Sequence, residues 1–320
     1  MLHIVNYHGN CPDGFVAYAL YHAWATARGD KVVGYPVAPH DPKTWPALPP
    51  SSTPWTAVFL DVVLDAETMR RWCSAAAHTL VIDHHGTSEA FLKEFKETER
   101  TTVLFSHEAC AAVLTHQHLY PGTPVPDWLW HVDRVDRWSG VTDHDVALRE
   151  YILPIARLPV SDPAQADKAL GYMASFVRRY SGGGTPMLEI LAESERRLSK
   201  KRRLLHAILM DEKRASRIAV DSLYCEEAGL DPVWENQMVF AIDTTGLYAF
   251  DSTLASYFVF AACPEVTVFT NYIRVGPEKY KYCVRSREFD VTSDGLFFGH
   301  PCAAGGVLES PKTKTPFVVR

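Results

Sequence analysis

Aspartate and histidine gather at four places in the N-terminal part of the chain: residues 7–14, Asp61, the triplet Asp83-His84-His85 and residues 131–138. Each of the first three begins where a short apolar run ends. Carboxylates that crowd together repel each other unless a cation neutralises them. Carboxylates and imidazoles without a cysteine quartet suit Mn²⁺, Fe²⁺ or Mg²⁺ better than structural zinc. The pattern therefore predicts a divalent-metal site that could clamp a phosphate group and activate water.

Taken singly, each cluster also has a plain structural explanation. Asp61 alone is more often a helix cap or a turn residue, and His8 alone is more often a structural histidine. Asp133 and Asp136 could be ion-pair partners of the neighbouring arginines. The triplet at residues 83–85 is harder to explain in this way, because its side chains are costly to bury unpaired. All four clusters in one stretch of chain favour a metal site.

The elements that must position these clusters alternate between strand and helix. The expected strands are residues 2–7, 31–35, 57–60, 80–82 and 101–105, and the expected helices are residues 14–28, 66–77 and 108–118. Such alternation predicts an α/β fold with a parallel sheet covered on both faces. Ligands bind such sheets at the C-terminal ends of the strands, which is where the first three clusters lie. The proline-rich residues 36–54 are expected to form a long loop.

A glycine-rich break at residues 181–185 divides the chain. Thr185 is expected to cap a helix that reaches about Lys213, with Pro186 in its first turn. The middle of this helix is basic, which indicates either a solvated face or a surface that attracts phosphate. In the last part, residues 238–242, 266–270 and 280–285 are strand-like and 252–262 helical. We therefore expect a catalytic domain (residues 1–184), a connector helix (185–213) and a smaller α/β domain (214–320).

The composition excludes several classes of protein. The net charge of -6 and the pI of about 6.2 give no bulk basic field for long nucleic acids. The seven cysteines are scattered, which argues against a disulfide framework and a structural zinc site. No apolar run reaches the roughly 18 residues of a membrane span, and the N-terminus lacks the pattern of a signal peptide. The expectation is a cytoplasmic protein without a membrane partner.

The motifs resemble those of the DHH phosphoesterases, a family named after the triplet seen here as Asp83-His84-His85. His8 with Asp13-Gly14 is similar to the first motif of the family, Asp61 to the second, and the region of Asp136 to the fourth. Residues 298–306 resemble the glycine-rich motif of the DHH-associated substrate-binding domain. Arg285-Ser286 also fits that domain. The resemblance spans nearly the whole chain, and the motifs occur in the expected order.

The resemblance implies a role for each of these residues. The implied metal ligands are His8, Asp13, Asp61, Asp83, His84 and Asp136. Asp83 would lie between two ions, and it would form the catalytic pair with His85. His85 would lie beside the phosphate, where an imidazole can stabilise it or protonate the leaving oxygen near neutral pH.

The same resemblance implies a substrate site in the last domain. Its expected residues are Arg285, Ser286, Gly299, His300, Ala304 and Gly305. Small residues let the backbone approach a nucleotide closely, and the planar guanidinium of Arg285 suits a phosphate. The alternative to a substrate site is that the glycine-rich segment only allows a tight bend of the chain.

The chain departs from the family pattern near Asp13. Many members carry a carboxylate two residues before this aspartate or two residues after it, where this chain has Cys11 and Phe15. Cys11 could replace an oxygen donor or be a plain buried thiol, so the occupancy of a second metal position stays open. Phe298 stands where another glycine is common. In the fourth motif Asp133 rivals Asp136.

The resemblance implies a phosphodiesterase whose active site lies in the cleft between the two domains. We expect it to hydrolyse short oligonucleotides from a chain end, or cyclic dinucleotides, to mononucleotides. The expected cofactor is one or two divalent ions, Mn²⁺ first and Mg²⁺ second. The expected partner is a nucleotide or a short single-stranded oligonucleotide, and no oligomeric state is predicted. Two alternatives stay open: a phosphomonoesterase acting on 3′,5′-bisphosphate nucleotides, and a non-catalytic nucleotide- or RNA-binding protein.

Overall fold

The structure of the protein is a computed structural model. It describes residues 1–39, 41–49, 54–95, 100–158, 162–228, 230–247, 250–277, 279–287, 289–293, 297–300, 302–309 and 317. The chain divides into two compact units, Met1–Arg197 and Leu198–Arg320, and the division falls inside the long helix α8 (Gly184–Leu209). Each unit is described below by itself.

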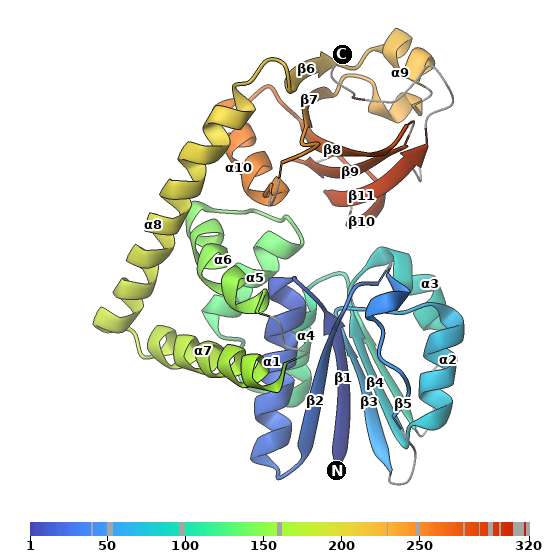
Figure 1. The fold of residues 1–320 in the computed structure, drawn as a ribbon, viewed down its shortest axis with the longest axis vertical. Helices are drawn as coiled ribbons and strands as arrows, with labels where there is room; N and C mark the ends of the chain where they lie inside the picture. The colour runs from blue at the N-terminus through green and yellow to red at the C-terminus, as the bar shows by residue number, and fades with distance from the viewer. Residues whose placement is uncertain are drawn as a thin grey trace. The chain divides into compact units, whose positions relative to one another are not determined.

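A five-stranded parallel sheet forms the centre of the N-terminal unit (Figure 1). Its strands are β1 (Leu2–His8), β2 (Lys31–Val37), β3 (Trp55–Leu60), β4 (His78–Asp83) and β5 (Thr101–Phe105). They lie in the order β2-β1-β3-β4-β5, and every neighbouring pair is parallel. The side chains of β3 are buried along its whole length, as expected of a central strand with both faces covered. The predicted α/β fold with a parallel sheet is confirmed.

Helices cover both faces of this sheet (Figure 1). One face packs against α1 (Pro12–Ala27) and α4 (Ala111–Leu119), and the other against α2 (Ala66–Ala75) and α3 (Gly86–Glu94). The alternation of side chains along β3 divides the core accordingly. Val58 lies in the cluster beneath α1, whereas Phe59 lies in the cluster beneath α2. The sheet therefore holds the starts of α1 and α3 at fixed places beside the ends of the strands that precede them.

Three further helices complete the unit: α5 (Asp127–Asp136), α6 (Asp143–Ala156) and α7 (Pro163–Ser181). Thr142 and Asp145 form a capping box at the start of α6. Asp145 is buried, and Arg134 of α5 donates to both of its oxygens at 3.0 and 2.6 Å. This ion pair ties the start of α6 to α5, the helix that carries Asp133 and Asp136.

A six-stranded mixed sheet forms the C-terminal unit, in the order β10-β11-β9-β8-β7-β6. The elements are β6 (Ala215–Ala219), α9 (Ser222–Ala228), β7 (Met238–Asp243), α10 (Ser252–Ala262), β8 (Val268–Gly276), β9 (Lys279–Ser286), β10 (Phe298–His300) and β11 (Ala303–Glu309). A short 3₁₀ turn, η2 (Pro232–Trp234), precedes β7. Among the described strands of this second sheet, only β7 and β8 pair in parallel, and α10 makes the crossover between them. The unit is thus α/β, as expected.

The proline-rich segment is more ordered than the sequence suggested. The edge strand β2 continues through Pro36 to Val37, and a 3₁₀ turn, η1 (Pro42–Thr44), follows it. Proline is tolerated there because an edge strand leaves one side of its backbone without a ladder partner. Residues 40 and 50–53 of this segment, and residue 301 of the glycine-rich motif, lie outside the described residues.

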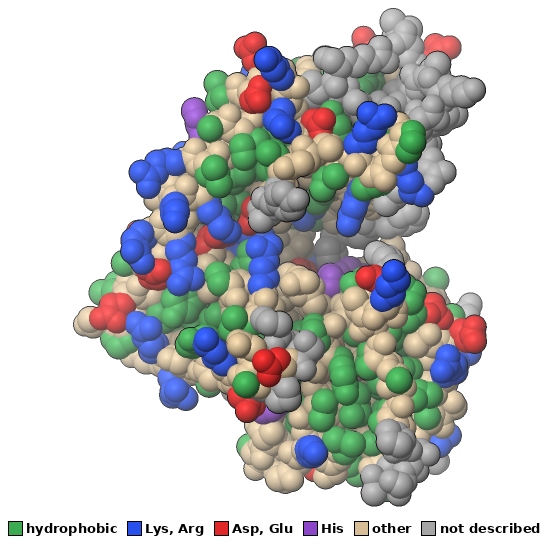
Figure 2. All heavy atoms as spheres, in the orientation of Figure 1, with side chains coloured by type: hydrophobic (Ala, Val, Ile, Leu, Met, Phe, Trp, Pro, Cys, Tyr) green, Lys and Arg blue, Asp and Glu red, His purple; other side chains and the backbone are tan. Residues whose placement is uncertain are grey.

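The basic stretch of α8 is largely engaged with its own surroundings. Figure 2 shows lysine and arginine side chains gathered along this helix. Glu193 accepts from Arg196 and Arg197, and Lys201 pairs with Asp251 at 3.3 Å. These pairs fit the plainer of the two interpretations, a solvated helix face. Over the part of the chain that is described, no helix combines the length and the apolar character that a membrane crossing needs.

Candidate metal centre

The order of the strands brings three of the four clusters to one edge of the sheet. β1 lies between β2 and β3, so the chain leaves β1 toward one side of the sheet and leaves β3 toward the other. Ligands of open α/β sheets usually bind at the carboxyl ends of two such strands. His8 is the last residue of β1, Asp61 follows β3 directly, and Asp83 ends β4. The three residues therefore lie at the carboxyl ends of neighbouring strands.

Asp61 has an unusual backbone conformation that turns its side chain into this edge. Its φ of 61° lies in the left-handed region, which non-glycine residues adopt rarely, aspartate and asparagine more often than most. Its backbone N–H donates to the carbonyl of Ile82 at 2.9 Å, which holds the turn. Asp61 Oδ2 then lies 3.2 Å from Nδ1 of His8, and Oδ1 lies 3.1 Å from Nε2 of His84.

Asp13 enters the centre from the first turn of α1 and is fully buried. The backbone N–H groups of Ala111 and Ala112, at the start of α4, donate to its two oxygens at 2.9 and 2.7 Å. Asp13 Oδ2 also lies 3.4 Å from Nε2 of His84. Gly14 lets the start of α1 lie against the end of β1, because a Cβ at this position would lie 2.5 Å from the carbonyl oxygen of His8.

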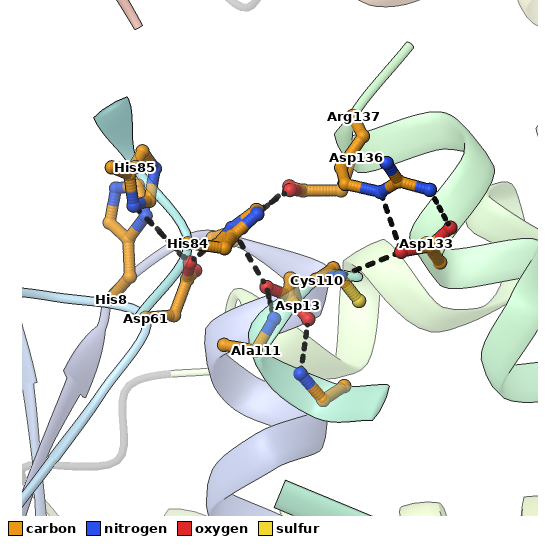
Figure 3. A network of polar contacts seen from close by, with 12 residues as sticks. His8, Asp13, Asp61, His84, His85, Cys110, Ala111, Asp133, Asp136 and Arg137 are labelled. Atoms are coloured by element: carbon orange, nitrogen blue, oxygen red, sulfur yellow. Dashed lines mark hydrogen bonds and ion pairs between the residues drawn. The ribbon is translucent and has the colours of Figure 1, made fainter. Parts of the chain in front are cut away.

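The two aspartates of α5 have different partners. Asp136 Oδ2 lies 3.3 Å from Nε2 of His84, so Asp136 faces the centre. Asp133 accepts from the backbone N–H of Cys110 at 2.7 Å and from the guanidinium of Arg137 at 2.8 Å on each oxygen. Asp133 therefore joins α5 to the start of α4, while Asp136 points at His84 (Figure 3).

Six side chains form two groups of three metal donors among the described residues. The Asp13 group is Asp13, His84 and Asp136, and the His8 group is His8, Asp61 and His85. Within each group the donor atoms lie within 4.8 Å of one another. Asp61 belongs to the His8 group, and its contact with His84 links the two groups. All six residues were expected from the sequence to lie at the site.

Burial and mutual charge shift the pKa values of these groups in opposite directions. Burial, followed by the charges of Asp61 and Asp136, holds the pKa of Asp13 well above its usual range. Burial also opposes ionisation of Asp61, but the contacts with His8 and His84 outweigh it and lower the pKa of Asp61. Against the cost of burial, the contact with Asp61 raises the pKa of His84 to about 9. Three carboxylates beside one imidazole thus attract positive charge.

The thiol of Cys11 contacts one carboxylate of the centre, that of Asp136. Cys11 caps the start of α1, and its Sγ lies 3.8 Å from Oδ1 of Asp136. Burial, and then the negative charges of Asp61, Asp136 and Asp13, raise the pKa of this thiol. Cys110 belongs to the apolar core under α1 and α4, and burial followed by the charges of Asp13, Asp136 and Asp133 raises the pKa of its thiol as well.

Asp83 lies outside both groups and contacts His85 instead. Its Oδ1 accepts from Nδ1 of His85 at 2.8 Å, and the hydroxyl of Ser88 donates to its Oδ2. Both oxygens are thus engaged in these contacts, and Asp61 is the residue that contacts both groups. The bridging role that the resemblance implied for Asp83 stays a prediction. Against the cost of burial, the charge of Asp83 and this hydrogen bond raise the pKa of His85 to about 10. Ser88 was not foreseen, because nothing distinguishes it from an ordinary serine in the first turn of α3.

The expected substrate residues of the C-terminal unit lie on three adjacent strands. The register aligns Arg285 of β9, Ala303 of β11 and His300 of β10 across the sheet, and it pairs Gly299 with Ala304. Gly305 requires its small size, because a Cβ there would lie 2.9 Å from the carbonyl oxygen of Tyr282.

The side chains of Arg285 and Ser286 contact the backbone of their own unit. Arg285 Nη1 donates to the carbonyl of Val284 at 2.9 Å, and the hydroxyl of Ser286 donates to the carbonyl of Phe289. Ser286 is also fully buried. A substrate-binding role for these two residues remains a prediction.

No protein-family model matches the chain, and no curated protein matches it. Solved structures that are similar to it include an uncharacterized protein from Helicobacter pylori G27 (13% identity, 99% of this chain and 95% of that chain, TM-score 0.34). Another is an exopolyphosphatase-related protein from Bacteroides fragilis (13% identity, 97% of this chain and 87% of that chain, TM-score 0.45). A third is RecJ from Thermus thermophilus in complex with Mn²⁺ (15% identity, 96% of this chain and 49% of that chain, TM-score 0.45). The chain thus spans about half of that RecJ chain. At these TM-scores the likenesses carry no argument about function.

Proposed function

We propose that the protein is a divalent-metal-dependent phosphoesterase of the DHH type. The observation that supports this most directly is the pair of donor groups linked by Asp61. Two ligands bound to one ion at about 2.1 Å lie roughly 3.0 to 3.4 Å apart at octahedral and tetrahedral angles. His84 Nε2 lies 3.4 Å from Asp13 Oδ2 and 3.3 Å from Asp136 Oδ2, which fits that spacing. The residues present therefore fit a divalent ion.

The donor chemistry agrees with the geometry. Carboxylate oxygens and imidazole nitrogens without a thiolate quartet suit Mn²⁺ or Mg²⁺. The Asp13 group would hold one ion and the His8 group a second. When bound, such ions supply positive charge for a phosphate group and activate water for its hydrolysis. Asp61, which contacts both groups, keeps their spacing.

His85 is the best-placed proton donor at this edge. Asp83 holds its Nδ1, which fixes the orientation of the ring and leaves Nε2 as the other polar atom. In the metal-free protein, the charge of Asp83 raises the pKa of His85 to about 10 against the cost of burial, so the ring is protonated at neutral pH. We infer that His85 stabilises the phosphate or gives a proton to the leaving oxygen. His85 is also a member of the His8 group, so metal content and turnover have to be measured together in a His85 variant.

The substrate we propose is a short oligonucleotide or a cyclic dinucleotide. The net charge of -6 gives no extended basic field, which favours a small anionic substrate over a long nucleic acid. In the C-terminal unit, the register places Arg285 and His300 in one row beside the small residues of β11. Such a row suits close approach of a nucleotide and its phosphate.

The test is hydrolysis of three substrates by the full chain, each with Mn²⁺, Mg²⁺ or EDTA. The substrates are an RNA dinucleotide, a longer single-stranded RNA, and adenosine 3′,5′-bisphosphate. Release of mononucleotides with a metal but not with EDTA supports the phosphodiesterase, and faster cleavage of the dinucleotide supports the short substrate. Loss of the 3′-phosphate from the bisphosphate alone would support the phosphomonoesterase. No turnover of these substrates or of cyclic dinucleotides, together with nucleotide binding, would support the binding protein. In His85→Ala, the turnover rate should fall by a larger factor than the content of bound metal.

A further inference from the structure

The side-chain amide of Asn271 is only half satisfied in the C-terminal unit. Asn271 lies on β8 and is 6% exposed. Its Nδ2 donates to the hydroxyl of Thr244 at 3.3 Å, whereas its Oδ1 has no hydrogen-bond partner among the described residues. A buried oxygen without a partner is costly, and nearly all such groups in proteins are paired. An asparagine at this position therefore needs a reason other than the stability of the fold.

The register of the sheet places Asn271 beside the expected substrate residues. β8, β9 and β11 are neighbours in the sheet (Figure 1). Asn271 pairs with Cys283 of β9, and Cys283 pairs with Gly305 of β11. Alternate residues of a strand share a face, so Arg285 lies on the same face as Cys283, whereas Val284 belongs to the apolar cluster of the opposite face. Asn271 thus lies one strand away from the arginine that is expected to bind phosphate.

Polar contacts continue from Arg285 to the start of α10 on this face. Nη1 of Arg285 lies 3.3 Å from Sγ of Cys283, and the thiol of Cys283 donates to the hydroxyl of Ser252 at 3.3 Å. These three side chains are half-buried, so α10 does not close the face off from solvent. A phosphate held by Arg285 would therefore place the attached nucleoside along a polar surface next to Asn271.

We propose that Asn271 is a specificity-determining residue whose Oδ1 accepts a hydrogen bond from the nucleoside part of the substrate. Because Nδ2 is engaged with Thr244, the amide is oriented and presents only an acceptor, so the matching group must carry an N–H or an O–H. A nucleoside offers two such donors, the 2′-hydroxyl of ribose and the exocyclic amino group of adenine, cytosine or guanine. The inference rests on the proposed nucleotide substrate, and it adds which nucleotides the site prefers.

The test is calorimetric titration of the full chain with three nucleotides in the presence of Mn²⁺. The ligands are AMP, 2′-deoxy-AMP, and purine riboside 5′-monophosphate, which lacks only the exocyclic amino group of AMP. The variants are the wild type, Asn271→Leu, and the matched control Thr270→Val, which removes a buried hydroxyl from the opposite face of β8. Asn271→Leu should fold, because the hydroxyl of Thr244 still donates to the carbonyl of Tyr272 at 2.9 Å, and thermal unfolding checks this.

We expect the wild type and Thr270→Val to bind one of the two analogues about tenfold or more weakly than AMP, as the loss of one hydrogen bond to a buried acceptor predicts. In Asn271→Leu, the affinity for AMP should fall to that for the weaker analogue, so that the difference between the two ligands disappears. Weaker binding of 2′-deoxy-AMP would identify the ribose hydroxyl as the donor, and weaker binding of the purine nucleotide would identify the amino group.

The outcomes separate this inference from the proposed function. Equal affinities of the wild type for all three nucleotides would overturn the role of Asn271, and so would a preference that persists in Asn271→Leu. Failure of the wild type to bind AMP would overturn it as well. Metal-dependent hydrolysis of the RNA dinucleotide is measured separately, so the phosphoesterase can stand when the inference fails. Absence of that hydrolysis would count against the phosphoesterase even where the binding preference is found.

Discussion

Replacing Asp61 with asparagine should weaken divalent-metal binding at both donor groups. Asp61 lies 3.2 Å from Nδ1 of His8 and 3.1 Å from Nε2 of His84, so it contacts a member of each group. Asparagine keeps the shape of the side chain and, like aspartate, tolerates the left-handed φ of 61°. An alanine would add backbone strain of about 1 kcal/mol, which would confuse the comparison. The matched control is Asp136→Asn, which removes a carboxylate from the Asp13 group alone.

The size of the effect follows from the charges involved. Two unit charges 4 Å apart interact with about 4 kcal/mol at an effective dielectric constant of about 20. A carboxylate near a doubly charged ion therefore contributes on the order of 8 kcal/mol before the cost of desolvation. If a third of this survives desolvation, the loss is about 2.7 kcal/mol, or roughly a hundredfold in affinity at each group.

The assay is calorimetric titration of the metal-free protein with Mn²⁺, together with thermal unfolding in EDTA to confirm that each variant folds. Asp61→Asn should weaken every binding event, and Asp136→Asn should leave one event near wild-type affinity. Equal losses in the two variants, or a single affected event in Asp61→Asn, would refute the reasoning that Asp61 links the two groups.

Three further predictions follow from the same geometry. Asp83→Asn should lower turnover at least about tenfold while metal content changes little, measured by kinetics and metal analysis, because Asp83 holds His85 and lies outside the donor groups. The metal-free protein should lose stability as pH rises from about 6.5 through about 9 and about 10, because His84 and His85 bind protons more tightly when folded. A melting temperature that rises over this range in EDTA would contradict that. Ala111→Pro should cost about 1.5 to 3 kcal/mol in denaturant unfolding, because it removes one N–H donor to Asp13 at a helix position where proline fits. An unchanged midpoint would show that this bond contributes nothing.

The parallel sheet and the edge that carries the site were predictable from local patterns. The apolar runs are short, and those at residues 2–7, 57–60 and 101–105 are each followed by helical periodicity, which is enough to predict strand and crossover. Because parallel strands end at one edge, His8, Asp61 and Asp83 could be expected to meet there. Helices α3 and α5 to α7 were not among the predicted elements. Residues 131–138 were predicted from their chemistry, without the helix that carries them.

The contacts of individual side chains were less predictable. Asp83 and Asp61 both follow buried strands, and the sequence does not tell which one turns toward the centre. In the structure, the left-handed backbone at Asp61 turns its side chain toward His8 and His84, whereas Asp83 contacts His85 and Ser88. Phe15 raised doubt about the second metal position, yet its side chain is fully buried in the apolar core with Tyr7.

The start of α4 connects the parts of the centre that the sheet does not hold. The first N–H groups of a helix lack partners within the helix. Here Cys110 donates to Asp133 of α5, while Ala111 and Ala112 donate to Asp13 of α1. One helix terminus thus aligns α1 with α5, and with them Asp13 and Asp136, on either side of His84. No motif in the sequence marks these backbone donors, because every residue except proline carries a backbone N–H group. The geometry of the donor groups therefore depends on residues whose identity carries no functional signal, which is why motif reasoning finds the ligands but not what holds them in place.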